Sequence, residues 1–311
     1  MDGRLAYPRR MSMANAPPTI RLGLVQLACS ENPRENLERA LSEVEAAARG
    51  GANVVCLPEL FSHRYFCQSE DAARFDLAEP IPGPTTELLA KVAAARKISL
   101  IASIFERRGE GLYHNTAVVF SPDGTLAGIY RKMHIPDDPL YYEKFYFTPG
   151  DTGFVAFDTT HARIGPLICW DQWFPEAARL TALAGAQVIA CPTAIGWQFD
   201  LDAAEDAAQH DAWETVQRSH AIANGVFVAA VNRVGFEPTE APGEGSGIRF
   251  WGQSFACDPM GRVLWRGSAT QEELGIVECD LSLVERTRRE WPFLRDRRVD
   301  AYPKLVRLLD D

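Results

Sequence analysis

Three ionisable side chains of different types stand where strand-like segments of the sequence end. Glu59, Lys132 and Cys169 each follow a short apolar run. Open α/β sheets usually build their sites in the loops after strands, so these positions are candidates for chemistry. The residues after Cys169 lead to Pro175, which predicts a helix N-terminus close to the thiol. Such a position lowers the pKa of a thiol and predicts a nucleophile.

Each of these side chains also has a structural interpretation. A cysteine at the end of an apolar strand is more often a small buried hydrophobe, Glu59 could cap a turn after Pro58, and Lys132 could be a solvated charge. None of the six histidines lies in a cysteine-protease motif, so we assign none of them to catalysis. Four other cysteines lie within apolar strand patterns and are expected to be buried: Cys56, Cys191, Cys257 and Cys279.

Strands and helices are expected to alternate along the chain, which positions these candidates at strand ends. In the first half we expect strands over 20–27, 52–57, 98–105, 116–121 and 125–131, and helices over 36–50 and 85–96. In the second half we expect strands over 163–169, 186–191, 225–232, 254–257, 263–266 and 275–280, and helices over 175–184 and 203–224. Two such halves can stack sheet on sheet, which predicts one layered α/β domain over residues 19–311.

Composition excludes several classes of function. The 311 residues carry a formal net charge of -10, which disfavours general binding to nucleic acid or to an anionic membrane. No apolar stretch reaches the roughly 18 residues that a membrane span needs. The seven cysteines contain no CxxC pair, so neither a disulfide framework nor a thiolate zinc site is indicated. We expect a cytoplasmic protein with a flexible extension over residues 1–18 and a C-terminal tail over 285–309 that packs on itself or on a neighbouring subunit.

Three short motifs occur in the order and approximate spacing of a known family. Leu57-Pro58-Glu59-Leu60, Tyr130-Arg131-Lys132 and Ile168-Cys169-Trp170-Asp171 match the Glu, Lys and Cys motifs of the nitrilase-like carbon-nitrogen hydrolases. Over residues 19–305 the chain resembles this family, and most of all its N-carbamoylputrescine amidohydrolases. That closer resemblance lies in Tyr65-Phe66-Cys67-Gln68, residues 133–150, residues 169–173 and Pro192-Thr193-Ala194-Ile195-Gly196-Trp197. It implies a four-layer αββα sandwich, a homodimer or higher homo-oligomer, and no metal or organic cofactor.

The resemblance also implies a role for each motif residue. It makes Cys169 the nucleophile, Glu59 the general base, and Lys132 a cation beside the tetrahedral intermediate. A thiolate attacks an amide or ureido carbonyl better than water does, and the backbone N–H of Trp170 could help Lys132 to stabilise the oxyanion. Glu143 matches a second carboxylate that the family places beside the lysine. Its structural alternative is a surface ion pair with a local cation.

A substrate that ends in a free amine would need a carboxylate and aromatic rings around that amine. An N-carbamoyl amino acid would instead need Arg or Lys for its carboxylate, and Arg64 and Arg179 keep that option open. We hypothesise hydrolysis of N-carbamoylputrescine to putrescine, carbon dioxide and ammonia, with other N-carbamoyl compounds and aliphatic amides as alternatives. The candidates for substrate contacts, each of which could instead serve the structure, are Tyr65, Asp137, Asp138, Trp170, Asp171, Trp173 and Trp197.

Two other classes of function remain as rivals. A non-catalytic member of the fold could bind a metabolite or a partner protein, but the intact Glu59, Lys132 and Cys169 set argues against it. A zinc-dependent amidohydrolase would need clustered His, Asp or Cys ligands, which the sequence does not display.

Overall fold

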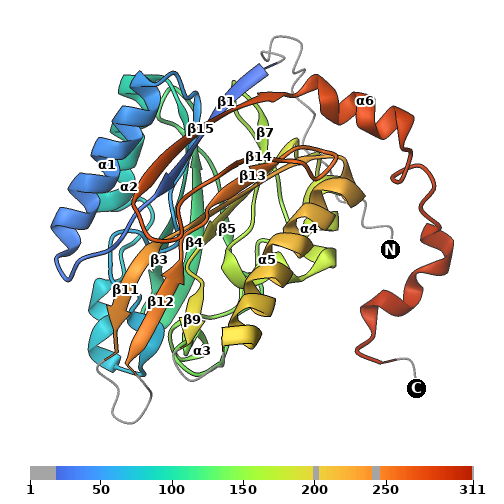
Figure 1. Ribbon diagram of the computed structural model, residues 1–311. Helices are drawn as coiled ribbons and strands as arrows, with labels where there is room; N and C mark the ends of the chain where they lie inside the picture. Colours follow the sequence, from blue (N-terminus) through green and yellow to red (C-terminus); the bar gives the residue numbers. More distant parts are fainter. Residues whose placement is uncertain (1–18, 199–202, 240–245, 310–311) are drawn as a thin grey trace, which may run out of the picture.

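Two large mixed sheets form the centre of the molecule (Figure 1). The structure is a computed structural model and describes residues 19–198, 203–239 and 246–309. In the first sheet β1, β2 and β3 are parallel, and β4 returns antiparallel to β3 and pairs with β5. The strands stand in the order β15 (Glu273–Asp280), β1 (Thr19–Gln26), β2 (Val54–Cys56), β3 (Ser99–Gly109), β4 (Leu112–Phe120) and β5 (Leu126–Arg131).

The second sheet repeats the parallel arrangement at its centre. Strands β7, β8 and β10 are parallel, and β13 is antiparallel to β10. The strands stand in the order β14 (Val263–Arg266), β13 (Phe255–Cys257), β10 (Phe227–Asn232), β8 (Val188–Thr193), β7 (Arg163–Pro166) and β6 (Phe157–Asp158). In each sheet the carboxyl ends of the parallel strands therefore meet at one edge.

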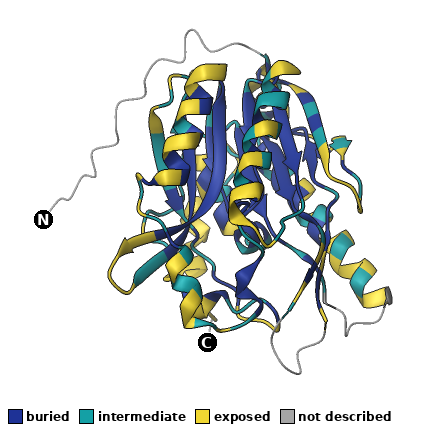
Figure 2. Cartoon of the chain, turned by 90° about the vertical axis from the view of Figure 1, so that its left-hand side faces the viewer, coloured by how far each residue is buried: buried dark blue, intermediate teal, exposed yellow. Residues whose placement is uncertain are grey.

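Helices cover the outer face of each sheet. Helices α1 (Pro33–Arg49) and α2 (Pro84–Arg96) pack on the first sheet, while α4 (Pro175–Leu183) and α5 (Ala203–Asn224) pack on the second (Figure 1). The apolar side of α1 faces its sheet because Ala40, Val44 and Ala47 recur at helical spacing and are all fully buried. Figure 2 shows the same division, with exposed residues along the outer side of the helices and buried residues in the strands.

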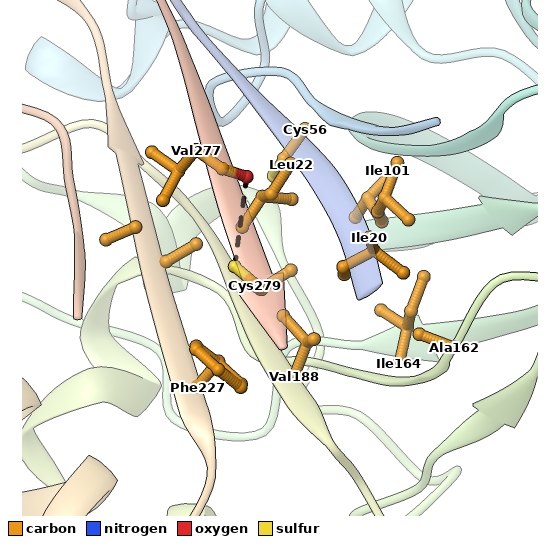
Figure 3. Packing of buried hydrophobic residues seen from close by; sticks show 14 of the residues in the cluster. Ile20, Leu22, Cys56, Ile101, Ala162, Ile164, Val188, Phe227, Val277 and Cys279 are labelled. Carbon is orange, nitrogen blue, oxygen red and sulfur yellow. Dashed lines mark hydrogen bonds between the residues drawn. The ribbon is translucent and has the colours of Figure 1, made fainter. Parts of the chain in front are cut away.

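Aliphatic side chains fill the space between the two sheets. Leu22 and Ile101 of the first sheet lie opposite Ile164, Val188 and Phe227 of the second, and all five are at most 1% exposed (Figure 3). Separate apolar clusters join each sheet to its helices. The order of layers is thus helix, sheet, sheet, helix, which confirms the predicted αββα sandwich.

The structure differs from the sequence-based expectations in two places that bear on the site. The strand expected over 163–169 ends at Pro166, so Cys169 lies in a 3₁₀ turn. A small third sheet was not predicted, and it consists of β11 (Val234–Pro238), β12 (Gly247–Trp251) and β9 (Gly196–Gln198). Residues 1–18, expected to form a flexible extension, lie outside the described residues.

The C-terminal segment begins as helix α6 (Ser282–Glu290) and then runs along the outside of the molecule (Figure 1). It exposes several large apolar side chains, among them Val299, Leu305 and Val306. Within the described ranges, no helix is long and apolar enough to cross a membrane.

Candidate active site

The three candidate residues meet at the edge where the carboxyl ends of the parallel strands converge. Glu59 follows β2, Lys132 directly follows β5, and Cys169 begins the 3₁₀ turn η3 (Cys169–Trp173) after β7. Because β2 and β5 belong to the first sheet and β7 to the second, the site takes residues from both sheets. The stacking of the sheets brings together side chains that are far apart in sequence.

Lys132 lies between two carboxylates. Its Nζ donates to Glu59 Oε1 at 2.8 Å and to Glu143 Oε2 at 2.6 Å, and all three side chains are 0% exposed. Burial alone would lower the pKa of Lys132, but the charges of Glu143 and Glu59 outweigh it and raise the pKa well above its usual value. Lys132 is therefore a fixed cation at neutral pH.

One oxygen of Glu59 is fully engaged, and the other is free. Oε1 accepts from Lys132 and also from Asn115 Nδ2 at 2.7 Å, while Asn115 Oδ1 accepts from the hydroxyl of Ser103. Oε2 is buried and has no hydrogen-bond partner among the described residues. A buried carboxylate oxygen without a donor can accept a proton, which is the property that a general base needs.

Glu143 lies at the start of the short helix α3 (Glu143–Tyr146). Its other oxygen, Oε1, accepts a hydrogen bond from the hydroxyl of Tyr65 at 2.7 Å. Burial raises the pKa of Glu143 to about 7, against the opposing charge of Lys132. Burial thus shifts the ionisation of Glu143 from acidic pH toward neutral pH. Tyr65, expected to contact substrate, is itself 1% exposed and binds this carboxylate.

Cys169 lies in a backbone conformation that is unusual for its residue type. Its φ angle is 41°, in the left-handed region, and its Sγ lies 3.7 Å from the carbonyl oxygen of Ala194. Gln172 Nε2 donates to the Cys169 carbonyl at 2.8 Å and to Thr193 Oγ1 at 2.9 Å, which ties the turn to the end of β8. A strained residue held in this way is typical of functional sites.

The expectation that a helix N-terminus lowers the pKa of the Cys169 thiol is wrong. Burial raises this pKa well above its usual value, the charge of Glu59 adds to the rise, and Lys132 only partly opposes both. The surroundings of the unliganded site therefore favour the thiol over the thiolate. Activation of the thiol then depends on transfer of its proton to a base, and not on a preformed thiolate.

Asp171 supports the Cys169 turn instead of facing the substrate. It is 0% exposed, and its oxygens accept from the hydroxyl of Tyr130 at 2.8 Å and from the backbone N–H of Ile168 at 3.0 Å. They also accept from the backbone N–H of His134 at 3.0 Å, and His134 Nδ1 lies 2.8 Å away. The expected contact between Asp171 and a distal amine does not fit this placement, because the carboxylate is already surrounded by partners.

A pocket of about 380 Å³ opens above Cys169, within the roughly 300–1,000 Å³ range of small-molecule sites. Of the residues expected to bind substrate, Trp170, Trp173 and Asp138 line it. Asp138 is exposed and is the one formally charged residue among the described residues of its lining. The aromatic rings of the lining come from Tyr141, Trp170, Trp173 and Trp251.

The other candidates for substrate contacts lie outside this lining. Asp137 is exposed, and Trp197 packs behind the pocket with its ring centroid 5.0 Å from that of Trp251. Arg64 pairs with Glu31 at 2.7 Å beside another pocket, and Arg179 lines a third hollow beside α5. Neither arginine is positioned to bind a carboxylate above Cys169.

Several residues of the site carried no signal in the sequence. Asn115 and Ser103 lie inside strands, where their side chains look like ordinary sheet residues, although both are fully buried. Trp251 contributes a pocket wall from β12, and Tyr141, which lies within the motif run 133–150, was not singled out as a substrate contact. The four cysteines expected to be buried are buried. Among the described residues, no group of three or more His, Cys, Asp or Glu side chains could hold a metal ion.

Comparison with known proteins identifies the family of this chain. A model of the carbon-nitrogen hydrolase family matches residues 21–289. The chain belongs to the carbon-nitrogen hydrolase family. Among its carbon-nitrogen hydrolase relatives, the N-carbamoylputrescine amidase of Oryza sativa subsp. japonica is 41% identical over 290 residues, which are 93% of this chain and 95% of that protein.

Two further relatives extend the comparison. The citrullinase of Francisella tularensis subsp. tularensis is 39% identical over 289 residues, covering 93% of this chain and 98% of that protein. The crystal structure of a carbon-nitrogen hydrolase from Helicobacter pylori G27 superposes with a TM-score of 0.91 at 45% identity, covering 94% of this chain and 100% of that one. The fold and the enzyme class are therefore those of a carbon-nitrogen hydrolase.

Proposed function

We propose that this carbon-nitrogen hydrolase uses Cys169 to hydrolyse N-carbamoylputrescine to putrescine, carbon dioxide and ammonia. The observation that carries the proposal is the position of Lys132, bound to Glu59 and Glu143 beside the Cys169 thiol. Cys169 lines the pocket, and Glu59, Lys132 and Glu143 lie near enough to its thiol to act on it electrostatically. We also propose that residues 19–311 form one catalytic domain, because the site needs both sheets.

In the first half-reaction Cys169 Sγ attacks the ureido carbon while Glu59 accepts the thiol proton. The free Oε2 of Glu59 is the acceptor, since its other oxygen is held by Lys132 and Asn115. Lys132 and the backbone N–H of Trp170 stabilise the oxyanion. When the tetrahedral intermediate collapses, the bond to the terminal nitrogen breaks and Glu59 returns the proton, so ammonia leaves.

In the second half-reaction water hydrolyses the carbamoyl-enzyme. Glu59 takes one proton from the attacking water and passes it to the departing Cys169 sulfur, which restores the thiol. The released carbamate then decomposes to the amine and carbon dioxide. Glu143 holds the Lys132 ammonium in place through both steps, so its charge state affects each of them.

The residues that line the pocket favour a substrate with an amine at the end opposite its ureido group. The exposed carboxylate of Asp138 can pair with an ammonium, and the rings of Trp170, Trp173 and Trp251 can shield the alkyl chain. Citrulline also has a ureido group and a distal ammonium, but beside that ammonium it carries a carboxylate, for which the described lining residues provide no cation. N-Carbamoyl-β-alanine meets the same obstacle.

The test is ammonia release from a panel of substrates at equal concentration. The panel contains N-carbamoylputrescine, citrulline, N-carbamoyl-β-alanine and a simple aliphatic amide. We expect the highest kcat/KM for N-carbamoylputrescine, and no turnover by Cys169→Ala. A preference for any other member would overturn the substrate assignment while leaving the mechanism intact.

A non-catalytic binding role is the rival from another class. With Glu59 accepting its proton, Cys169 should react with iodoacetamide much faster than the buried Cys191 or Cys257, as followed by mass spectrometry of the intact protein and its peptides. Uniformly slow labelling, together with no hydrolysis of any substrate, would favour the binding role.

We further propose that the protein forms a homodimer or a higher homo-oligomer in the cytoplasm. The C-terminal segment leaves Val306 90% and Leu308 103% exposed, and apolar surface of this kind is usually covered by a partner. The seven cysteines are all free thiols, as is usual in a reducing compartment. Sedimentation of the full chain tests the assembly, and a monomer at all concentrations would contradict it.

A further inference from the structure

A buried arginine lies directly behind the turn that carries Glu59. Arg233 follows β10 and is 0% exposed. Its Nη2 donates to the backbone carbonyl of Glu59 at 2.7 Å and to that of Leu60 at 3.1 Å, and its Nη1 donates to the carbonyl of His63 at 3.2 Å. One guanidinium therefore holds three carbonyl groups of the same turn.

This turn needs external support because its backbone is strained. Leu60 has a φ angle of 48°, a conformation that residues with side chains rarely adopt. On the other side of the turn, the Leu60 N–H donates to Ser103 Oγ at 3.3 Å, and Ser103 in turn binds the Asn115 that holds the Glu59 carboxylate. Arg233 and this chain of hydrogen bonds thus fix Glu59 from two directions.

The partner of Arg233 extends the support to the second carboxylate. Arg233 Nη1 donates to Glu237 Oε1 at 2.7 Å, and both side chains are buried. Glu237 Oε2 accepts the backbone N–H of Tyr65 at 2.6 Å, and the Tyr65 hydroxyl donates to Glu143. The guanidinium also lies 5.9 Å from the Tyr65 ring centroid, which restrains the ring itself.

We propose that Arg233, together with Glu237, is a positioning residue that holds both Glu59 and Glu143 against Lys132. This inference rests on the proposed function, in which these two carboxylates serve Cys169 chemistry. Arg233 is absent from the lining of the Cys169 pocket, so it acts through the backbone of Glu59 and through Tyr65. Its planar fork spans four acceptors at once, which the single nitrogen of a lysine cannot do.

The test compares Arg233→Lys with wild type in steady-state kinetics. Misplacing the base should lower kcat by about 100-fold and leave KM within about threefold, because the substrate pocket is unchanged. The double variant Arg233→Met/Glu237→Gln leaves no unpaired charge behind, and the amide oxygen of the introduced glutamine can still accept the Tyr65 N–H, so this variant should fold and show the same loss of kcat. Circular dichroism and thermal melting verify folding.

Arg163→Lys is the matched control, since Arg163 is a partly buried arginine paired with Asp158 at 3.2 Å near the opposite ends of the strands. It should lose stability without losing kcat. A folded Arg233→Lys with wild-type kcat, or one whose only defect is a raised KM, would overturn the positioning role.

The rate of Cys169 alkylation by iodoacetamide separates this inference from the proposed function, because it needs no substrate. We expect slower labelling of Cys169 in both Arg233 variants and an unchanged rate in Arg163→Lys. If wild type hydrolyses none of the panel but this difference in labelling persists, the proposed function fails and the positioning role stands. Equal labelling rates in wild type and the Arg233 variants would reject the positioning role, whatever the substrate.

Discussion

Replacing Tyr65 with phenylalanine tests whether Glu143 must be ionised during turnover. The Tyr65 hydroxyl donates to Glu143 Oε1 at 2.7 Å in a buried setting. Burial raises the pKa of Glu143 to about 7, while the charge of Lys132 and the hydrogen bond from Tyr65 oppose the rise because they stabilise the carboxylate. Removing the hydroxyl removes one of these opposing contributions, so the pKa of Glu143 should move upward.

The size of the shift follows from the strength of the bond that is lost. A hydrogen bond to a charged group contributes about 1.5–3 kcal/mol, and one pKa unit corresponds to about 1.4 kcal/mol. Tyr65→Phe should therefore raise the pKa of Glu143 by roughly 1 to 2 units. In wild type, kcat/KM should rise as the pH increases through about 7, and in the variant the same rise should occur at roughly 8 to 9.

The assay is the initial rate of ammonia release as a function of pH. Glu143→Gln should abolish this ascending limb as well as lowering kcat, because position 143 then carries no group that titrates. Tyr146→Phe is the control, since the Tyr146 hydroxyl donates to the backbone carbonyl of Ser69 and not to a catalytic carboxylate. A folded Tyr65→Phe enzyme whose limb stays at the wild-type pH would refute the reasoning.

Three further outcomes are expected. Cys169→Gly should be more stable than Cys169→Ala by about 1 kcal/mol in denaturant unfolding, because glycine adopts the positive φ without steric cost; equal stability would show that the turn is unstrained. Asp171→Asn should lose about 2 kcal/mol or more and most of the activity, because in either orientation the amide nitrogen faces a backbone N–H that now donates to an oxygen, that of Ile168 or that of His134; a wild-type melting temperature would contradict this role. Asp138→Asn should raise KM for N-carbamoylputrescine about 2- to 5-fold at low salt and leave KM for an uncharged amide unchanged; an equal effect on both would exclude an ion pair with the substrate.

The sequence predicted the layers well because hydrophobic periodicity is a local signal. The long helix α5 (Ala203–Asn224) and the strand β14 (Val263–Arg266) have the predicted bounds. The third sheet was missed because β9, β11 and β12 are short, and because β9 pairs with β12 across a large separation in sequence. Such strands are stabilised by tertiary contacts, which no local pattern records.

Only the site residues that belong to recognisable sequence motifs were predicted. The structure brings Glu59, Lys132 and Glu143 into direct contact, as their matches to the family motifs implied. Asp171 was misplaced because an aspartate after a catalytic cysteine looks the same in sequence whether it faces a ligand or a backbone N–H. Arg233 and Glu237 resemble a surface ion pair in sequence, and only the fold reveals that they are buried behind the Glu59 turn.

The division of the site between two sheets also bears on how the enzyme is made. Glu59, Lys132 and Glu143 leave the ribosome before any of the second sheet exists, and N-terminal regions generally begin to fold first. A nascent chain at that stage has its charged groups but lacks Cys169. The enzyme therefore becomes active only after Cys169 has been made, and a chain cut short before residue 169 would not hydrolyse ureas or amides.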